Sequence, residues 1–179
     1  MKIVLPKDIY NVMEEPLFFI GGPIKGGGDW QSACCVEISR NIADFCAAVP
    51  CRYSLNHRLY PYKVGERFFD RQLPWERYYL NQAAHKGCVI FWLPTESVEY
   101  PRNDGFPYAM DTRGELGEWR GRLMYDKELK VVIGAEKDFP GRDVMSRNFS
   151  EALGAPFPVY DTLEETVAEA VTLSRRPTI

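Results

Sequence analysis

Two short stretches of this sequence are apolar from end to end, Leu17–Gly21 and Cys88–Leu93. An unbroken apolar run of strand length is typical of a strand that is buried on both faces of a parallel sheet. Parallel neighbours need a crossover connection, usually a helix, so this feature strongly constrains the fold. Further strand patterns are found at Lys2–Leu5, Cys51–Leu55, Leu129–Gly134 and Phe157–Tyr160.

The segments between these runs have the apolar spacing of helices. One helix is expected from Trp30 to about Ala48, with Asp29 as its N-cap and a stripe of apolar residues that ends at Phe45. A second is expected from Pro74 to Gly87, because proline suits the first turn of a helix and glycine suits the position after its end. Three more helices are expected to begin near Asp111, to span Asp143–Leu153, and to follow Thr162.

This alternation predicts a single α/β domain over residues 1–179, with a mostly parallel sheet of about five strands. Between His57 and Leu73 the sequence is rich in aromatic residues and shows no regular pattern. Such a loop is suited either to stacking on a base or sugar or to packing on a partner subunit, and the residues leave both alternatives open.

The first buried strand runs into a glycine-rich turn, Gly21-Gly-Pro-Ile-Lys-Gly-Gly-Gly28. A turn of this kind between a strand and a helix presents backbone N–H groups to an anion, typically a phosphate. It matches neither the P-loop pattern nor the G-x-G-x-x-G pattern of dinucleotide-binding folds. The alternative is a flexible surface turn without a ligand.

Glu115 opens a helix that follows the second buried strand, the place where open α/β folds put their chemistry. Its helix has a buried stripe at Leu116, Trp119 and Leu123, and Glu118 lies near the same edge. A structural interpretation competes with a catalytic one. In the pattern Thr112-x-x-Glu115, the threonine would be the N-cap and the glutamate would bind its backbone N–H as a capping box.

Several classes of function are disfavoured by composition. The net charge of −3 gives no basic surface for a nucleic acid polymer. The five cysteines form no C-x-x-C pair, so we expect neither disulfides nor a metal site, and Cys34, Cys35 and Cys88 fit core packing. No apolar run approaches the length of a membrane span, and we expect a cytoplasmic protein.

Three motifs, in this order along the chain, resemble the nucleoside 2-deoxyribosyltransferase superfamily, and most closely its deoxyribosyltransferase-like branch, which includes nucleotide N-glycoside hydrolases. They are the strand and turn Phe18-Phe-Ile-Gly-Gly-Pro-Ile24, the run Gln72-x-x-Trp75-Glu76, and Gly114-Glu115-Leu116-Gly117. The last is similar to the Glu-Leu-Gly motif that supplies the nucleophile of that family.

The resemblance implies a three-layer α/β sandwich with a Rossmann-like sheet, no cofactor, and cleavage of an N-glycosidic bond. Glu115 would attack C1′ and form a covalent ester. Asp111, Glu76 and Glu118 are the candidates for the acid that assists the leaving base. A nucleoside or nucleoside 5′-monophosphate substrate would contact Gly21, Gly22, Pro23, Ile24, Lys25, Asp29, Trp30, Gln72, Asp104, Tyr108 and Glu118.

One position departs from the family pattern. The transferases carry an aspartate six residues before the nucleophile, where this chain has Ala109, and Asp104 or Asp111 could substitute for it. Members of the family often assemble, so a homodimer or larger homo-oligomer is expected. Two alternatives stay open: a non-catalytic nucleotide-binding protein, and a glycohydrolase that cleaves the nicotinamide–ribose bond of NAD.

Overall fold

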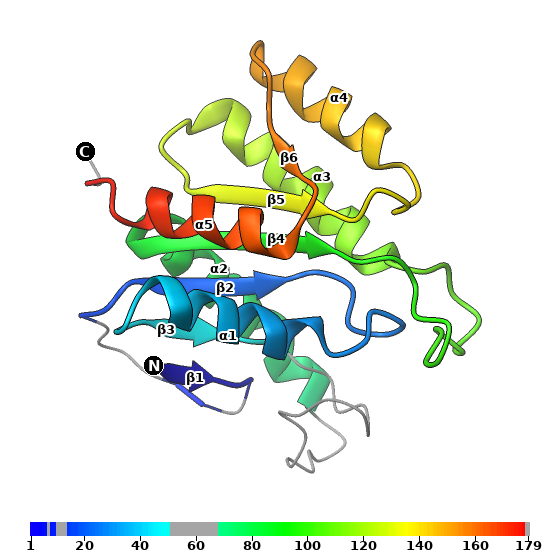
Figure 1. Ribbon diagram of the computed structural model, residues 1–179, viewed down its shortest axis with the longest axis horizontal. Coiled ribbons are helices and arrows are strands. Elements are labelled where there is room, and N and C mark those ends of the chain that lie inside the picture. Colours follow the sequence, from blue (N-terminus) through cyan, green and yellow to red (C-terminus); the bar gives the residue numbers. More distant parts are fainter. Residues whose placement is uncertain (7, 10–13, 51–67, 178–179) are drawn as a thin grey trace.

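A single parallel sheet forms the centre of the computed structural model, which describes residues 1–6, 8–9, 14–50 and 68–177 (Figure 1). The order of the strands in the described chain is β1-β3-β2-β4-β5-β6, and each neighbouring pair is parallel. The predicted α/β class with a mostly parallel sheet is therefore confirmed, with six strands described. Their bounds are β1 Lys2–Val4, β2 Leu17–Gly21, β3 Cys46–Ala48, β4 Gly87–Leu93, β5 Val131–Ala135 and β6 Val159–Tyr160.

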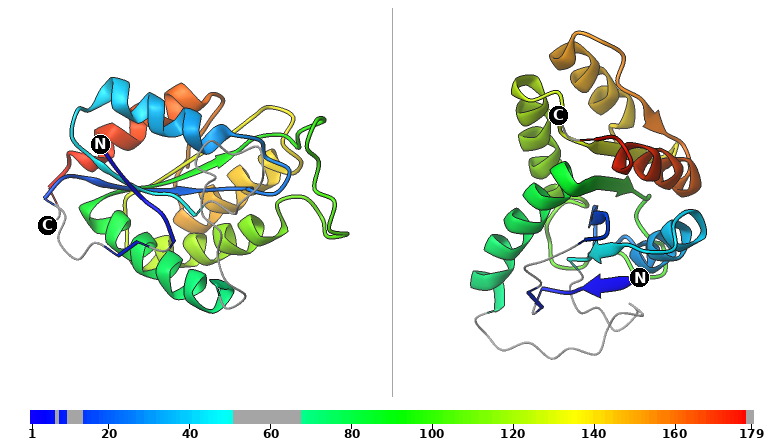
Figure 2. Two further views of the ribbon diagram at one scale, coloured as in Figure 1. Left: turned by 90° about the horizontal axis from the view of Figure 1, so that it is seen from below. Right: turned by 90° about the vertical axis from the view of Figure 1, so that its left-hand side faces the viewer.

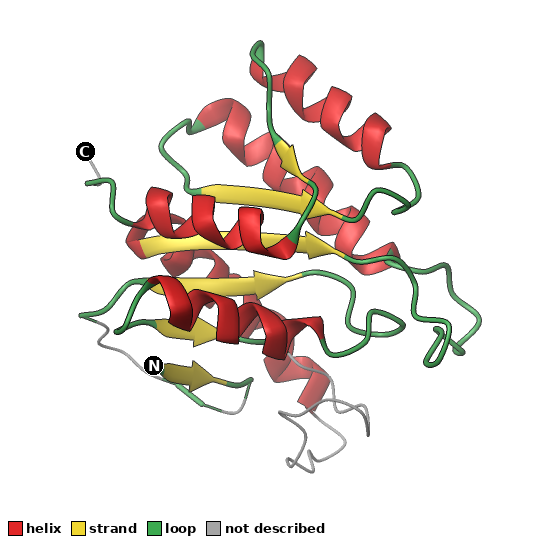
Figure 3. Ribbon diagram, in the orientation of Figure 1, coloured by secondary structure: helices red, strands yellow, loops and turns green. Residues whose placement is uncertain are grey.

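Helices cover both faces of the sheet, which gives three layers (Figures 2 and 3). Successive residues of a strand point to opposite faces. Phe18 of β2 accordingly packs in the cluster that contains α1 and α5, whereas Phe19 packs in the cluster that contains α2 and α3. The predicted three-layer sandwich is consistent with this packing. The helices are α1 Trp30–Asn41, α2 Phe68–Lys86, α3 Met110–Tyr125, α4 Arg142–Leu153 and α5 Leu163–Ser174.

The direction in which the sheet grows reverses at β2. From β2 the chain crosses to β3 on one side, and it then returns to place β4 on the other side of β2. Connections that leave neighbouring parallel strands in opposite directions open a crevice at the carboxyl ends of those strands. The topology therefore predicts a ligand site where β2 and β4 end.

The helix that was expected to run from Trp30 to about Ala48 is shorter, and this prediction was wrong beyond Asn41. Ile42 is extended (φ −149°, ψ 132°), and Cys46–Ala48 is the strand β3. Phe45 fits the apolar spacing of the helix but lies beyond its end. It is buried because it packs edge-on against Phe18 of the sheet, with ring centroids 6.0 Å apart. The strands β1 and β2 pair with β3 on its two sides and satisfy its backbone hydrogen-bonding groups. The local sequence of β3 does not reveal these two partners.

The helix α2 begins at Phe68, six residues before Pro74, so its predicted start was also wrong. Proline inside a helix removes one backbone hydrogen bond, a loss that tertiary packing can offset. In the turn before Pro74, Gln72 is buried and bonds to Glu76 one turn later. The expected strand at Cys51–Leu55 lies outside the described residues, as does most of the stretch from His57 to Leu73, although its end from Phe68 onward is helical rather than irregular.

The remaining elements follow the predictions closely. A complete capping box at Thr162 and Glu165 begins α5, and Gly154 in the left-handed conformation ends α4. The side chains of Cys34, Cys35 and Cys88 are buried in the core, as expected. Among the helices of the described chain, none combines the length and the apolar character that crossing a bilayer requires.

Candidate active site

A pocket opens at the carboxyl ends of β2, β3 and β4, where the topology predicts a crevice. Its walls come from segments far apart in the sequence: the turn after β2, the end of β3, helix α2, the β4–α3 loop and the start of α3. The residues that line it are Phe19, Gly21, Gly22, Pro23, Ile24, Lys25, Pro50, Glu76, Arg102, Ala109, Asp111, Thr112 and Glu115.

Glu115 lies in this pocket and does not belong to a capping box. The helix α3 begins at Met110, and its N-cap is Ala109, which is in the left-handed conformation (φ 58°, ψ 21°). Thr112 is therefore the third residue of the helix and is buried, so it cannot act as the N-cap. The capping-box interpretation of Thr112 and Glu115 is wrong, because the helix starts earlier than the local pattern indicates.

Three carboxylates line the pocket together. Asp111 and Glu115 come from the first two turns of α3, and Glu76 comes from α2. Glu76 is buried, and its Oε1 accepts a hydrogen bond of 2.6 Å from Nε2 of Gln72. Asp111 is exposed and Glu115 is half-buried, so the acids differ in their environment. Carboxylates in distinct environments can divide the roles of nucleophile, acid and base among them.

The glycine-rich turn forms the wall that faces them. Gly22 has φ +148°, and a Cβ atom there would come within 2.2 Å of the carbonyl oxygen of Trp92. The indole Nε1 of Trp30 donates to the carbonyl oxygen of Pro23 at 2.8 Å. The backbone N–H of Ser97 donates to the carbonyl oxygen of Gly26 at 2.7 Å. These contacts hold the turn from behind, which favours a fixed wall over a flexible surface turn.

A network of charged side chains closes one side of the pocket. Asp104 accepts hydrogen bonds from Nζ of Lys25 at 2.6 Å and from Nε of Arg102 at 2.6 Å. These bonds hold the pKa of Asp104 well below its ordinary value, and the bond from Arg102 has the larger effect on that pKa. Lys25 and Arg102 line the pocket, whereas Asp104 does not.

Five other predicted site residues do not line the pocket. Trp30 and Gln72 support residues that do, as described above. The hydroxyl of Tyr108 donates to the carbonyl oxygen of Pro94 at 2.8 Å, and burial raises the pKa of Tyr108. Glu118 is exposed and lies 3.9 Å from Arg122, and Asp29 sits at the N-cap of α1 without a side-chain cap hydrogen bond.

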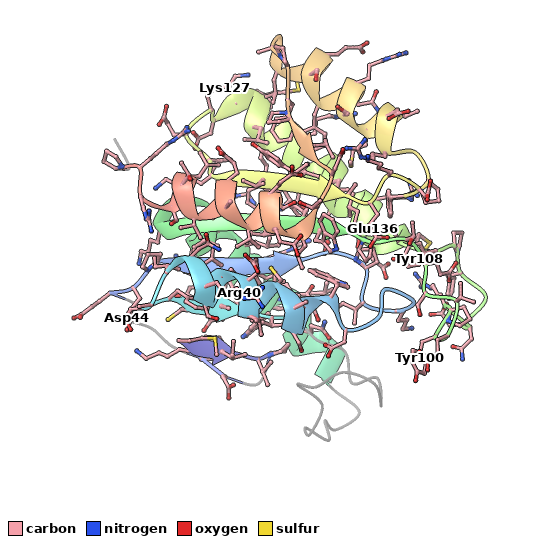
Figure 4. The ribbon with its side chains drawn as sticks, in the orientation of Figure 1. Arg40, Asp44, Tyr100, Tyr108, Lys127 and Glu136 are labelled. Carbon is pink, nitrogen blue, oxygen red and sulfur yellow. The ribbon has the colours of Figure 1, made fainter. Side chains whose placement is uncertain are left out.

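The loop between β4 and α3 projects from the carboxyl ends of the strands, beside the pocket (Figure 1). Figure 4 shows Tyr108 and Glu136 near its base and Tyr100 farther out. Glu136 fastens the start of the loop by accepting hydrogen bonds from the backbone N–H and the hydroxyl of Thr95, at 2.8 and 2.6 Å. The loop is thus anchored to the end of β5.

Five lining residues were not predicted from the sequence as site residues: Phe19, Pro50, Arg102, Ala109 and Thr112. Arg102 had one usable signal, a cation in a loop that follows a buried strand. Pro50 follows β3, which was mistaken for helix, so it had none. Among the described residues, no group of three or more His, Cys, Asp or Glu side chains is arranged to hold a metal ion. The sequence matches no protein-family model and no curated protein.

Proposed function

We propose that this chain is an enzyme that cleaves or transfers the N-glycosidic bond of a nucleoside or nucleoside 5′-monophosphate, with Glu115 as the nucleophile. The observation that supports this most directly is the pocket at the switch point of the sheet. There Glu115 faces the same space as Asp111, Glu76 and the turn Gly21–Lys25. Because α3 begins after Ala109, Glu115 does not belong to a capping box, which also favours a role for it in that space.

In the proposed first step, a carboxylate oxygen of Glu115 attacks C1′ as the bond from C1′ to the base breaks. The base leaves with the bonding electron pair and takes a proton for which Asp111 is the proposed donor, and a glycosyl ester remains on Glu115. In the second step, water or a nitrogen of another base attacks C1′. The ester bond then breaks, the Glu115 carboxylate is restored, and the attacking group loses a proton to Asp111.

Glu76 has a different role in this proposal. Its Oε1 accepts from the Gln72 amide, which fixes the orientation of the Glu76 carboxyl group in the pocket. We assign it to a sugar hydroxyl or to the attacking water. Asp111, which is exposed at the start of α3, is left as the acid.

A non-catalytic nucleotide-binding protein is the alternative that one observation favours. Ala109 stands where the family's transferases have an aspartate, and it places no carboxylate on that part of the wall. A binder would hold the same ligands without releasing base. A glycohydrolase acting on NAD would share the chemistry but would prefer a different substrate.

The experiment is a chromatographic assay of free base with deoxynucleosides, their 5′-monophosphates and NAD, each with and without a second base. We expect release or exchange of base by the natural chain and its loss in Glu115→Gln. Glu128→Gln, which changes an exposed carboxylate just beyond α3, is the matched control and should keep its activity. Ligand binding without any base release would favour the binder, and release from NAD alone would favour the glycohydrolase.

We further propose that the protein works in the cytoplasm as a homo-oligomer. The buried thiols of Cys34, Cys46 and Cys88 are compatible with a reducing compartment. Light scattering of the purified chain should give the mass of a dimer or larger, and the mass of a monomer would contradict the proposed assembly.

A further inference from the structure

Contacts within the protein occupy the hydrogen-bond acceptor positions of Asp104, so none is left for a substrate. Its Oδ2 accepts from Nζ of Lys25 at 2.6 Å and from a terminal nitrogen of Arg102 at 3.2 Å. Its Oδ1 accepts from Nε of Arg102 at 2.6 Å and from the backbone N–H of Phe106 at 3.3 Å. A carboxylate offers about four lone-pair sites, and all are used. Asp104 therefore acts on the pocket through the cations that it holds.

Arg102 is held by Asp104 yet keeps hydrogen-bond donors for a ligand. Its side chain is only 6% exposed, and it lines the pocket. Two of its N–H groups bond to Asp104 and one bonds to the carbonyl oxygen of Pro107 at 3.1 Å. A guanidinium has five N–H donors, so two remain. A guanidinium fixed along one edge can present its other donors to a pair of oxygen atoms, as in bidentate recognition of phosphate.

The two cations come from separate loops that are joined beside the pocket. Lys25 belongs to the turn after β2, and Arg102 belongs to the β4–α3 loop. Besides the Asp104 bridge, the N–H of Ser97 bonds to the carbonyl oxygen of Gly26 at 2.7 Å. A Cβ atom at Gly26 would lie 3.0 Å from the backbone nitrogen of Arg102, so the two loops are in close contact. Asp104 thus fixes both the side chains and the distance between the loops.

The charges of the pocket are divided between its walls. Glu76, Asp111 and Glu115 lie on α2 and α3, and the two cations lie on the loops. A ligand that is anionic at one end and develops positive charge at the other fits this division, because each end faces the opposite sign. A 5′-monophosphate whose sugar passes through an oxocarbenium-like state is such a ligand.

We propose that Asp104 is a positioning residue that holds Arg102 and Lys25 as the binding site for the anionic oxygens of the substrate, so that the pocket selects nucleoside 5′-monophosphates over nucleosides. This inference rests on the proposed function for the identity of the ligand. It assigns phosphate recognition to two side chains of this chain, and it removes Asp104 from the residues that could replace the carboxylate missing at Ala109.

The test measures binding rather than turnover, so that its failure is distinguishable from failure of the proposed chemistry. Calorimetry on the Glu115→Gln chain gives the dissociation constants of the deoxynucleoside 5′-monophosphates, the matching deoxynucleosides and inorganic phosphate. We expect Asp104→Asn to weaken binding of the monophosphates by about tenfold, because Arg102 and Lys25 lose the carboxylate that positions them, and to leave nucleoside binding unchanged. Asp104→Glu, which keeps the charge, should recover part of this loss.

The matched control is Asp161→Asn, because Asp161 also bridges an arginine and a lysine, Arg142 and Lys137, but beside the edge strand β6. It should leave the affinity for all ligands unchanged. Tighter monophosphate binding by Asp104→Asn would overturn the proposal, since it would make Asp104 a mere counter-charge. Equal loss of nucleoside and monophosphate binding would also overturn it, as would nucleoside binding without monophosphate binding by the Glu115→Gln chain that keeps Asp104.

Discussion

Gln72 donates a hydrogen bond of 2.6 Å from its Nε2 to Oε1 of Glu76, and both side chains are buried on α2. The two residues are four apart, which brings them together on one side of the helix. Only Glu76 lines the pocket, so Gln72 acts as a support behind it. The motif Gln72-x-x-Trp75-Glu76 thus encodes one pocket residue and the partner that orients it.

Replacing Gln72 with leucine should therefore destabilise the chain and impair the pocket. Leucine removes a donor from a buried carboxylate, so we expect the free energy of unfolding to fall by about 1–3 kcal/mol. Urea denaturation followed by circular dichroism measures this change. Gln82→Leu, at a half-buried position of the same helix, is the control, and an equal effect of both substitutions would contradict this role of Gln72.

Gly22 should tolerate a side chain far less well than Gly28. Both have positive φ, so an alanine at either position is strained. At Gly22 a Cβ atom would also meet the carbonyl oxygen of Trp92 at 2.2 Å and the ring of Trp30 at 2.8 Å, whereas nothing lies within 4 Å at Gly28. We expect Gly22→Ala to cost about 2 kcal/mol or more beyond Gly28→Ala. Equal melting temperatures for the two variants would show that the turn has room to move.

The capping box of α5 predicts a local loss of stability. Thr162 accepts from the backbone N–H of Glu165 at 3.1 Å, and the Glu165 carboxylate accepts from that of Thr162 at 3.2 Å. Thr162→Ala should reduce the free energy of unfolding by about 1 kcal/mol. Thr172→Ala, an exposed position near the other end of the same helix, should change it by less than about 0.5 kcal/mol. A larger effect at Thr172 would argue against the box as the stabilising element.

The ion pairs of Asp104 should depend on pH only in strong acid. Because the pKa of Asp104 is lowered in the folded chain, its contribution to stability is complete above the pKa of the unfolded state, near 3.9. That contribution is lost as the pH falls toward the folded value. The stability difference between the natural chain and Asp104→Asn should therefore be constant from about pH 5 to 8 and shrink below about pH 4. A difference that changes between pH 5 and 8 would assign the titration to another group.

The parts of the fold that the sequence predicted well are those that local pattern determines. Unbroken apolar runs identified β2 and β4, and the Thr162 box identified the start of α5. The same Thr-x-x-Glu pattern failed at Thr112. Its helix starts from Ala109 in a left-handed conformation that alanine rarely adopts, so no propensity indicates it.

The candidate site was predicted in part for a similar reason. Residues on the turn after β2 and at the start of α3 follow buried strands, and their place in a parallel sheet brings them to one edge. The role of Asp104 could not be read in the same way. Its partner Lys25 lies 79 residues away, and only the folded chain brings the two together. Strand β3 likewise depends on neighbours that are distant in sequence.

In the proposed reaction, Glu115 becomes covalently bound to the sugar during turnover. Acid quenching of the natural chain with a reactive deoxynucleoside 5′-monophosphate, followed by mass spectrometry of the intact chain and its peptides, tests this directly. We expect a mass increase of one glycosyl phosphate on the peptide that contains Glu115, and its absence in Glu115→Gln. Base release with an adduct on another carboxylate, or with no adduct at all under conditions that trap such esters, would contradict it.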